Sequence, residues 1–566
     1  MEKIWQLKKK VSDDPIEQLL FNRGIVKKIG STEDLKKFLE PDFDKDFFDP
    51  WLLPDFEVAI NRIKSAIGGQ EKIGIYADYD ADGIPGAALL YRALQTLENQ
   101  AEIYIPARVD GYGFNKSGID YLISKGCKLI ISVDLGIREL EFAKYIAERN
   151  VDLIISDHHE PDDELPKTLA VINPKRKDSK YPFRELCGAG VVFKIIQGLG
   201  KFYPKKINEK FLKWNLDLPA ISTISDVVPL ISENRIIAKF GLKVLSKTKN
   251  IGLQELYKVA NIDQNKIDSY TVGFQIGPRI NAPGRLDHAT ESFVLLTTKD
   301  PERAYKSAKH LQEKNEVRQI EMEKIFQSAI KIIDSQKLAV GKIIIVKKSG
   351  WQKGIIGPVA SRIVEKYLRP VIILSEKNGI LDGSCRSISG FDITKALQSS
   401  EKYLLGFGGH SGAAGVHLEE KDFEKFKEKI SEYANEKISE DQLLPKIPID
   451  LELGKRKISV NLFKEFEKFE PFGLGNPKPI FLTSNIKLIS HRLVGKENKH
   501  LQLRFSDGIS ETKAVVFNHG IDLKKLISGE NYNIVYQPGL NFWNGKNWID
   551  LRLLDIKNSE GASPQI

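Results

Sequence analysis

The stretch Ile73-Gly-Ile-Tyr-Ala-Asp78-Tyr-Asp80-Ala-Asp82-Gly83 decides the fold of this chain. It begins with a short apolar run that predicts a buried strand over 73–77, and residues 86–97 predict a helix. The three carboxylates therefore occupy a strand-to-helix loop, where open α/β sheets place their ligands. Because carboxylates this close repel one another unless cations neutralise them, they predict a site for Mg²⁺ or Mn²⁺. A solvated acidic turn or a helix cap is the alternative.

Two later strands end in groups of the same kind. Residues 128–133 form an apolar run that ends at Asp134, and residues 151–156 form another that ends at Asp157-His158-His159. The alternation of strands and helices over 55–240 predicts a mostly parallel sheet with helices on both faces. The carboxyl ends of such strands share one edge, so we expect these side chains to meet. Imidazole ligands shift the preference from Mg²⁺ towards Mn²⁺ or another transition ion.

Asp226 is a further candidate ligand, because it follows an apolar helix and precedes a stop at Pro229. A polar helix end without function is the alternative. The motifs at 78–83, 134–137, 157–159, 226–229 and 277–285 together resemble the DHH phosphoesterase superfamily. Within it they resemble the RecJ family of bacterial single-strand-specific 5′→3′ DNA exonucleases. The resemblance covers about residues 50–560. Pro85 and Pro283 depart from the usual family pattern, but neither removes a ligand.

The resemblance implies a set of functional residues around two bound ions, Mn²⁺ or Mg²⁺. The ions would be carried by Asp80, Asp82, Asp134, His158 and Asp226, with Asp134 as the bridging ligand. Asp78 and Asp157 would be further ligands or would orient the others, and His159 would contact the scissile phosphate. Substrate phosphates would be bound by Arg279, Asn281, Arg285, Arg386, Gly408, Gly409 and His410.

The same resemblance divides the chain into six segments. These are an N-terminal helical segment packed on the catalytic domain (1–54), a DHH catalytic domain (55–300), a long connecting helix (301–338), a DHHA1 substrate-binding domain (339–440), an OB-fold nucleic-acid-binding domain (441–558) and a disordered tail (559–566). The connecting helix is also indicated by a charged amphipathic stretch without internal glycine or proline. Coiled-coil dimerisation is its alternative, but the heptads are not sustained.

Three glycine-rich stretches invite phosphate binding. Residues 188–190 open a helix whose amides could hold a phosphate, although close helix packing explains these glycines equally well. Residues 275–285 form a predicted loop in which two arginines could fork phosphate oxygens, with an inter-domain salt-bridge loop as the alternative. Residues 406–415 form a predicted glycine-rich loop that lets the backbone approach a phosphate, with His410 as a donor.

Short alternating strands dominate residues 486–554. Asn544-Gly545 predicts a hairpin turn between two of them. The strands carry interleaved basic and aromatic residues, which is typical of an OB-fold that stacks single-stranded bases. The predicted DNA contacts are Arg504, Lys513, Phe517 and Trp543. The alternative places these aromatic residues in an ordinary barrel core.

Composition narrows the class of protein and its cellular compartment. The chain has 566 residues, 41% hydrophobic and 28% charged, with a net charge of +9, which permits a polyanionic partner. Three widely spaced cysteines indicate a reducing compartment and argue against a zinc or disulfide framework. The sequence shows neither a secretory signal nor an apolar run that could span a membrane, so we expect a cytoplasmic protein.

Three functions remain in view. The first is a single-strand-specific 5′→3′ exonuclease of DNA repair and recombination that releases 5′-mononucleotides through water activated by two ions. Its partners would be single-stranded DNA, a single-strand-binding protein and a helicase, and it would act as a monomer. The second is a related phosphodiesterase for short oligonucleotides or cyclic dinucleotides, which would not need the terminal β domain. The third is a scaffold without catalysis, which the filled ligand positions disfavour.

Overall fold

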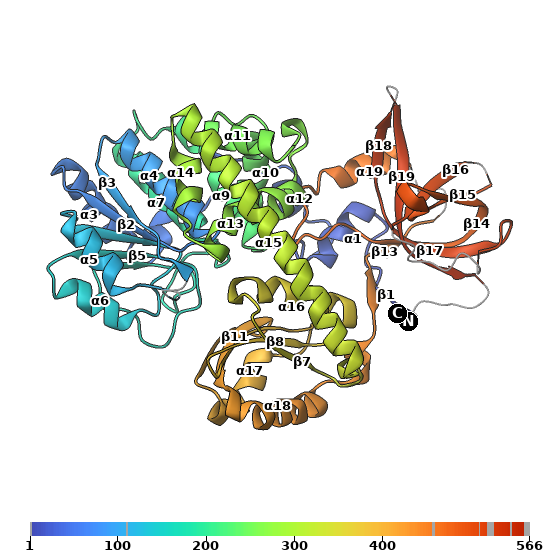
Figure 1. Cartoon of the computed structure of the whole chain (residues 1–566). Coiled ribbons are helices and arrows are strands. Elements are labelled where there is room, and N and C mark those ends of the chain that lie inside the picture. The colour runs from blue at the N-terminus through green and yellow to red at the C-terminus, as the bar shows by residue number, and fades with distance from the viewer. Residues whose placement is uncertain are drawn as a thin grey trace.

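The computed structural model describes residues 3–108, 111, 113–454, 459–508, 510–517, 526–543 and 546–559. Three bodies are visible in Figure 1: an α/β domain in blue to green, a second α/β domain in gold below it, and a red β-barrel to one side. The long helix α15 runs from the first domain to the second. This arrangement confirms the predicted α/β fold with a terminal OB-like barrel.

The first domain is built on a parallel sheet. Its strands are β2 (Ile73–Ala77), β3 (Ala101–Tyr104), β4 (Leu129–Val133), β5 (Asp152–Ser156) and β6 (Ala170–Ile172). All four pairings are parallel. Helices α3 (Phe56–Gly68), α4 (Gly83–Thr96) and α7 (Gly188–Phe202) pack on one face, and α5 (Lys116–Ser124) and α6 (Leu140–Ala147) pack on the other. The central strands β2 and β4 are buried on both faces, which explains their continuous apolar sequences.

Strand order places the ligand-bearing loops. The sheet runs β3-β2-β4-β5-β6, so the chain moves outwards in opposite directions from the neighbouring strands β2 and β4. Open α/β sheets bind ligands at such a switch point, beyond the carboxyl ends of the strands. Asp78 follows β2 and Asp134 follows β4, so both carboxylates lie at this point.

A helical layer completes the first domain. It comprises α8 (Glu209–Trp214), α9 (Asp217–Ser225), α10 (Ser232–Leu245), α11 (Ile251–Val259), α12 (Ser269–Thr271), α13 (Gly277–Leu286) and α14 (Thr290–Thr297). The prediction of a loop over 275–285 is wrong, because residues 277–286 form α13 with Pro283 inside it. Pro278 lies in the first turn of that helix, where a proline is tolerated, and the strong glycine and proline signal concealed the helix.

Helix α15 (Pro301–Ser335) joins the two α/β domains as one uninterrupted element. Ala308 and Leu311 belong to the core of the first domain, while Ile325, Ala329 and Ile333 belong to the core of the second. At about 1.5 Å per residue, its 35 residues span about 52 Å. The helix is therefore a connector that is anchored at both ends.

The second domain has a mixed sheet in the order β10-β11-β9-β8-β7. Its elements are β7 (Ile344–Ser349), α16 (Lys353–Tyr367), β8 (Val371–Lys377), β9 (Ile380–Arg386), α17 (Ile393–Gln398), β10 (Gly406–His410), β11 (Ala413–Glu419) and α18 (Phe423–Lys437). Helix α16 packs on one face, and α17 and α18 pack on the other. The predicted glycine-rich loop at 406–415 is wrong for most of its length, because these residues form the hairpin of β10 and β11.

The C-terminal domain is a closed barrel. Its strands are β14 (Phe481–Val494), β15 (His500–Ser506), β16 (Glu511–Val516), β17 (Asn531–Gln537) and β19 (Lys546–Asn558), accompanied by β13 (Leu451–Glu452), β18 (Leu540–Trp543) and α19 (Val460–Glu467). Strand β14 pairs with β15 and β17, and β19 pairs with β16 and β17, so the sheet closes. The predicted turn at 544–545 lies outside the described residues, as does the predicted disordered tail (559–566) apart from Ser559. Strand β19 continues through Asn558, and the Ser559 amide donates to the Asn531 carbonyl.

The N-terminal segment packs differently from the prediction. Helices α1 (Pro15–Asn22) and α2 (Thr32–Leu39) contribute Leu19, Leu20 and Phe38 to the core of the barrel domain. The strand β1 (Ile4–Leu7) pairs with β12 (Lys446–Ile449). The expected packing on the catalytic domain is therefore incomplete: α1 and α2 insert into the barrel core, α2 also contacts Arg235 of the catalytic domain through Phe38, and the later part of the segment, with Phe43 and Leu53, joins the catalytic core. Within the described part of the chain, no helix combines the length and apolar character needed to cross a membrane.

Candidate active site

The loop after β2 is fixed by contacts from three directions. The Asp80 carboxylate accepts hydrogen bonds from the amides of Asp82 (2.8 Å) and Gly83 (3.0 Å), which starts α4. Asn281 on α13 accepts a hydrogen bond from the Ala81 amide at 2.7 Å. The Ser222 hydroxyl on α9 donates to the carbonyls of Ala81 and Asp82. Asn281, which was predicted to bind substrate, thus holds the carboxylate loop with its side-chain oxygen.

Asp82 is held by the first turn of α7. Its two carboxylate oxygens accept hydrogen bonds from the amides of Gly188 (2.6 Å) and Ala189 (2.8 Å). The positive end of the helix dipole also favours an anion there. The amides that were considered for phosphate therefore bind the carboxylate of Asp82. Position 188 also requires a glycine, because a Cβ there would lie 2.7 Å from the side chain of Asp134.

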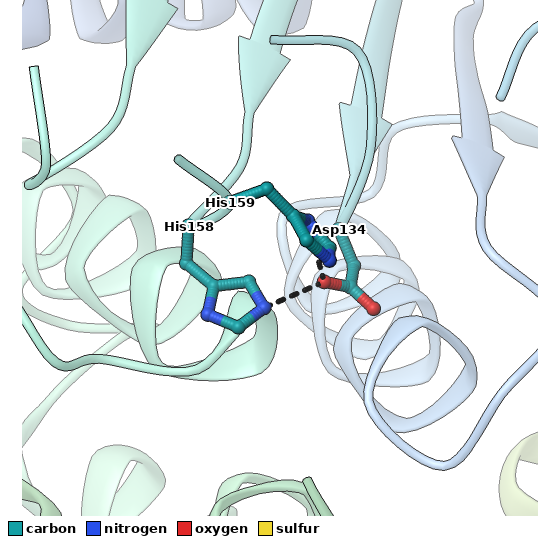
Figure 2. A group of neighbouring side chains, drawn as sticks. All are labelled: Asp134, His158 and His159. Atoms are coloured by element: carbon teal, nitrogen blue, oxygen red, sulfur yellow. Dashed lines mark ion pairs between the residues drawn. The ribbon is translucent and has the colours of Figure 1, made fainter. Parts of the chain in front are cut away.

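Asp134 adopts a left-handed backbone conformation, with φ of 65°. A non-glycine residue in this region is uncommon, and such strain gathers at functional sites. The turn directs its carboxylate towards His158, whose Nε2 lies 3.1 Å from Asp134 Oδ1 (Figure 2). The same imidazole nitrogen lies 3.5 Å from Asp82 and 3.7 Å from Asp226. His158 therefore stands among three carboxylates that come from three different elements.

His159 points to the same side, with Nδ1 3.9 Å from Asp134 Oδ1 (Figure 2). Its Nδ1 also bonds to Asp157 at 2.8 Å. Asp157 is fully buried and accepts further hydrogen bonds from the amides of Ile137, His158 and His159. Because its oxygens are engaged with protein donors, Asp157 orients His159 and the end of β5. Burial opposes protonation of His159, but the Asp157 carboxylate prevails and raises the His159 pKa to about 9.

The carboxylates and imidazoles of this region form three overlapping sets, and within each set the ligand atoms lie within 4.8 Å of one another. The sets are Asp134, His158 and His159; Asp82, His158 and Asp226; and Asp78, Asp80 and Asp134. Asp134 and His158 each belong to two sets. Asp157 belongs to none of these sets. This pattern suits two neighbouring cations that share ligands.

The electrostatics of the cluster fit divalent cations. Burial, followed by repulsion from neighbouring carboxylates, raises the pKa of Asp78, Asp134 and Asp226 well above the ordinary value. Burial also raises the pKa of Asp82. The Oδ1 atom of Asp78 is buried without a hydrogen-bond partner, which is costly unless a cation binds it. Oxygen ligands with one or two imidazoles suit Mg²⁺ or Mn²⁺.

Two basic side chains of the second domain share charged neighbours with this cluster. Arg386 ends β9, and His410 ends β10. The charge of Lys175, which follows β6 in the first domain, affects the pKa of both Asp226 and His410. The Lys175 side chain thus lies near both the carboxylate cluster and His410. Burial, with the positive charges of Arg386 and Lys175, lowers the pKa of His410.

Two of the predicted glycines precede His410 on β10. A Cβ at Gly408 would meet nothing within 4 Å, so the backbone there is open to a ligand. Gly409 has φ of 151°, and a Cβ there would lie 2.3 Å from the carbonyl oxygen of Ala413. Gly409 is thus required by the hairpin itself.

A group of arginines lies between the two domains. Arg285 donates to the carbonyl of Gly354 at the start of α16, at 2.9 Å. Burial and the nearby charges of Arg108 and Arg318 lower the pKa of Arg285 to about 10, so it remains a cation at neutral pH. Arg279 donates to Gln312 on α15 and to the carbonyl of Gln275, both at 2.7 Å. Some hydrogen-bond donors of the two predicted phosphate-binding arginines are therefore already used within the protein.

Sequence reasoning missed three cations of this region. Arg108 follows β3 and Lys175 follows β6, so the strand-end argument applied to all five strands would have found both. Arg108 lies over the ring of Tyr79, within the carboxylate loop, at 4.4 Å. Arg318 is on α15, where a charged residue on a long amphipathic helix carries no signal of its own.

The outer face of the barrel carries a second candidate surface, on β15, β16 and β19. Lys513 pairs with Arg504 on one side and Asp550 on the other. Lys513 lies 5.9 Å from the ring of Trp548, which is 54% exposed. Phe517 is 50% exposed and contacts the ring of His500 at 5.1 Å. The side chain of the fourth predicted residue, Trp543, lies outside the described part.

Some of these barrel residues are engaged within the protein. Arg504 forms an exposed ion pair with Glu511 at 2.6 Å. Arg552 lies 5.6 Å from the ring of Phe517. Exposed aromatic rings flanked by cations are typical of surfaces that stack single-stranded bases. His500, Trp548 and Arg552 extend the predicted set.

The parallel sheet with this cluster at its switch point defines a DHH phosphoesterase. Family models match in the same order along the chain: the DHH family N-terminal domain over residues 72–222, the DHHA1 domain over 336–436 and the RecJ OB domain over 449–555. The chain belongs to the RecJ family. It is 37% identical to the single-stranded-DNA-specific exonuclease RecJ of Bacillus subtilis, over 96% of this chain and 68% of that protein.

Other relatives agree with this assignment. The RecJ of Haemophilus influenzae is 30% identical over 96% of each chain. The crystal structure of RecJ from Thermus thermophilus in complex with Mn²⁺ superposes with a TM-score of 0.82 at 26% identity, covering 98% of this chain and 79% of that one. A structure of the same protein with Mg²⁺ gives 0.75 at 25% identity, covering 98% and 78%.

Proposed function

We propose that the chain is a single-stranded-DNA-specific exonuclease that degrades DNA 5′→3′ to 5′-mononucleotides in repair and recombination, with Mn²⁺ or Mg²⁺ as cofactor. The observation that carries this proposal is the carboxylate and imidazole cluster at the switch point of the parallel sheet. The polarity and the mononucleotide product are proposed from membership of the RecJ family.

The protein's contribution to hydrolysis is to hold and orient charge. Divalent cations bound in this site would neutralise negative charge on the phosphate and, as Lewis acids, would lower the pKa of an attacking water. Asp80, Asp82, Asp134, His158 and Asp226 would hold the two ions, and Asp78 joins them because its free oxygen lies in the same cluster. Asp134 belongs to two ligand sets, which supports its role as the shared ligand.

The second α/β domain would bind the substrate. Arg386 and His410 can each donate to a phosphate oxygen, and the open backbone at Gly408 lets a strand approach closely. His159 is the exposed imidazole of the pair, with 43% of its side chain accessible, and Asp157 keeps it oriented. We assign His159 to the scissile phosphate and Arg279 and Arg285 to neighbouring phosphates.

The closed barrel distinguishes this proposal from the small-substrate alternative. A cyclic dinucleotide needs only the two α/β domains, whereas exposed Phe517 and Trp548 on the barrel suit a longer strand. The proposal also includes a monomeric enzyme in the cytoplasm that receives DNA from a single-strand-binding protein and a helicase.

A time course on end-labelled DNA tests the proposal. Single-stranded DNA labelled at the 5′ end, and separately at the 3′ end, is incubated with Mn²⁺, Mg²⁺ or EDTA, alongside blunt duplex. We expect immediate release of the 5′ label as a mononucleotide with either ion, and no release in EDTA or from duplex. Earlier loss of the 3′ label would reverse the proposed polarity, and cleavage of dinucleotides alone would favour the small-substrate phosphodiesterase.

A further inference from the structure

Two arginines meet where the catalytic domain, the N-terminal helices and the barrel join. Arg235 is on α10 of the catalytic domain and is 1% exposed. Arg23 follows α1, which packs on the barrel. Among the described residues, neither guanidinium forms an ion pair with a carboxylate. Burying a cation without a carboxylate partner costs free energy, so other groups must compensate its charge.

Arg235 reaches two segments outside its own domain. Its Nε donates to the carbonyl of Phe38 at 2.6 Å, and the guanidinium lies 4.0 Å from the ring of the same residue. Its two Nη atoms donate to the carbonyls of Phe469 (2.8 Å) and Lys468 (2.9 Å). Phe38 belongs to α2, and residues 468–469 follow α19 on the way into the barrel. One side chain thus ties α10 to both segments.

Arg23 completes the junction from the other side. It donates to Asn476 at 2.9 Å and to the carbonyl of Pro477 at 2.7 Å, and it lies 5.1 Å from the ring of Phe469. Asn476 in turn donates to the Phe469 carbonyl at 2.7 Å, the same carbonyl that Arg235 uses. The two arginines are therefore linked through Phe469 and its carbonyl group.

Several further contacts cross the same junction. The Leu230 amide donates to the Leu474 carbonyl at 2.7 Å. Lys239, one turn beyond Arg235 on α10, donates to the carbonyl of Leu39. Domain linkers are usually exposed and make few contacts across the boundary. Here the connecting backbone is bound by charged donors, each of which contributes more than a neutral hydrogen bond.

We propose that Arg23 and Arg235 form a rigid clasp that fixes the barrel relative to the active site. They are positioning residues for the exonuclease reaction on long strands. This inference rests on the proposed function, because it assumes that the barrel and the active site bind the same strand.

If the barrel is fixed relative to the active site, a strand bound to the barrel has a high effective concentration at the active site. A strand held on the barrel then presents its end to the active site without ordering a flexible tether. Loss of the clasp lowers that effective concentration, so the KM for long strands rises. Turnover of a dinucleotide, which cannot reach both surfaces, remains unchanged.

The experiment uses the full chain with Arg235→Met or Arg23→Met, and with Lys243→Met as a matched control. Lys243 is two turns from Arg235 on α10 and carries the same charge, but it makes no described carbonyl bond. Spin labels on Lys144→Cys and Lys487→Cys, both exposed, report the distance between catalytic domain and barrel. The native cysteines are buried and stay unlabelled. Steady-state kinetics on dinucleotides and long strands provide kcat and KM.

We expect both arginine variants to broaden the distance distribution and to raise KM for long strands about tenfold or more. We expect kcat on dinucleotides, and all properties of the control, to stay at the wild-type level. The salt dependence of strand binding should keep its slope, because buried Arg235 cannot contact a phosphate.

Three results would overturn the clasp. These are a narrow distance distribution in both variants, a broad one with unchanged KM, or an equal loss of dinucleotide turnover, which would mean that the arginines support the catalytic fold. Failure of the proposed function looks different, because the wild-type enzyme itself would then show no preference for long strands. Arg23 lies outside the catalytic domain, so its variant keeps the test valid if Arg235→Met does not fold.

Discussion

Replacing Gly188 with alanine should disable the active site through one added methyl group. The new Cβ would lie 2.7 Å from both Cβ and Oδ1 of Asp134. Carbon atoms in contact normally stay about 3.5–4.0 Å apart, so one of the two groups must move by about 1 Å. Asp134 is confined by its left-handed turn, and Gly188 is confined by its bond to Asp82. Either movement displaces a ligand carboxylate.

The size of the effect follows from that displacement. Misplacement of a catalytic group by about 1 Å costs about 10²-fold in rate, so kcat/KM should fall at least about 100-fold. This corresponds to about 2.7 kcal/mol of lost transition-state stabilisation. Overpacking should also reduce the free energy of unfolding by about 1–3 kcal/mol. Affinity for Mn²⁺ should fall with the activity.

Gly190→Ala is the matched control, because it lies two residues further along the same helix. A Cβ there would meet its nearest atom at 3.4 Å, which is an ordinary contact. Alanine should stabilise the helix by up to about 1 kcal/mol and leave activity unchanged. The assays are mononucleotide release from labelled single-stranded DNA, Mn²⁺ calorimetry and thermal unfolding. Wild-type kcat/KM and Mn²⁺ affinity in Gly188→Ala would refute the reasoning.

Three other perturbations give separate outcomes. Asp157→Asn should lower activity or metal affinity about 10–100-fold in nuclease assays and calorimetry, because His159 loses its charged partner; unchanged values would remove Asp157 from the site. Glu233→Gln leaves the buried Lys194 cation without its charged partner at 2.5 Å and should cost about 3–5 kcal/mol in urea unfolding, whereas Asp163→Asn in the exposed pair with Lys177 should leave the free energy of unfolding nearly unchanged; equal losses would contradict this. Phe517→Ala or Trp548→Ala should weaken binding of long single strands by about 1–3 kcal/mol without changing dinucleotide turnover, and unchanged binding would exclude this face of the barrel.

The buried thiols should react only at high pH. Burial raises the pKa of Cys127 to about 11 and that of Cys385 to about 12, so at pH 8 about one Cys127 thiol in a thousand, and fewer of Cys385, is ionised. Both should resist alkylation until the pH approaches these values or the chain unfolds, and mass spectrometry measures the labelling. Rapid labelling of the native protein at pH 8 would contradict this burial.

Much of the fold was readable because each element has a strong local signal. Four of the five parallel strands are short, mainly apolar runs, and α15 lacks internal glycine and proline, so pattern alone located them. Helix α13 and the hairpin of β10 and β11 were misread, since glycine and proline signal turns even where tertiary contacts impose regular structure. The packing of α1 and α2 was misplaced because amphipathic periodicity shows that a helix has an apolar face but not which core receives it.

The residue types of the active site are determined by the sequence itself. Carboxylates and imidazoles at the ends of parallel strands must share one edge of the sheet, so the chain alone could place together Asp80, Asp82, Asp134 and His158. Their division of labour came from tertiary structure. Asp157 orients while Asp134 belongs to two ligand sets, and only the distances to neighbouring donors distinguish these roles.

Tertiary structure alone also decided what surrounds the cluster. The amides of α7 hold Asp82, Asn281 holds the carboxylate loop, and Arg235 joins α10 to the approach to the barrel. Each of these contacts links residues more than 100 positions apart, and backbone amides and carbonyls carry no sequence signature. Sequence thus determined which groups perform the chemistry, since strand periodicity and side-chain type are local properties. The fold determined how those groups are held, since hydrogen-bond partners are fixed only when distant segments pack together.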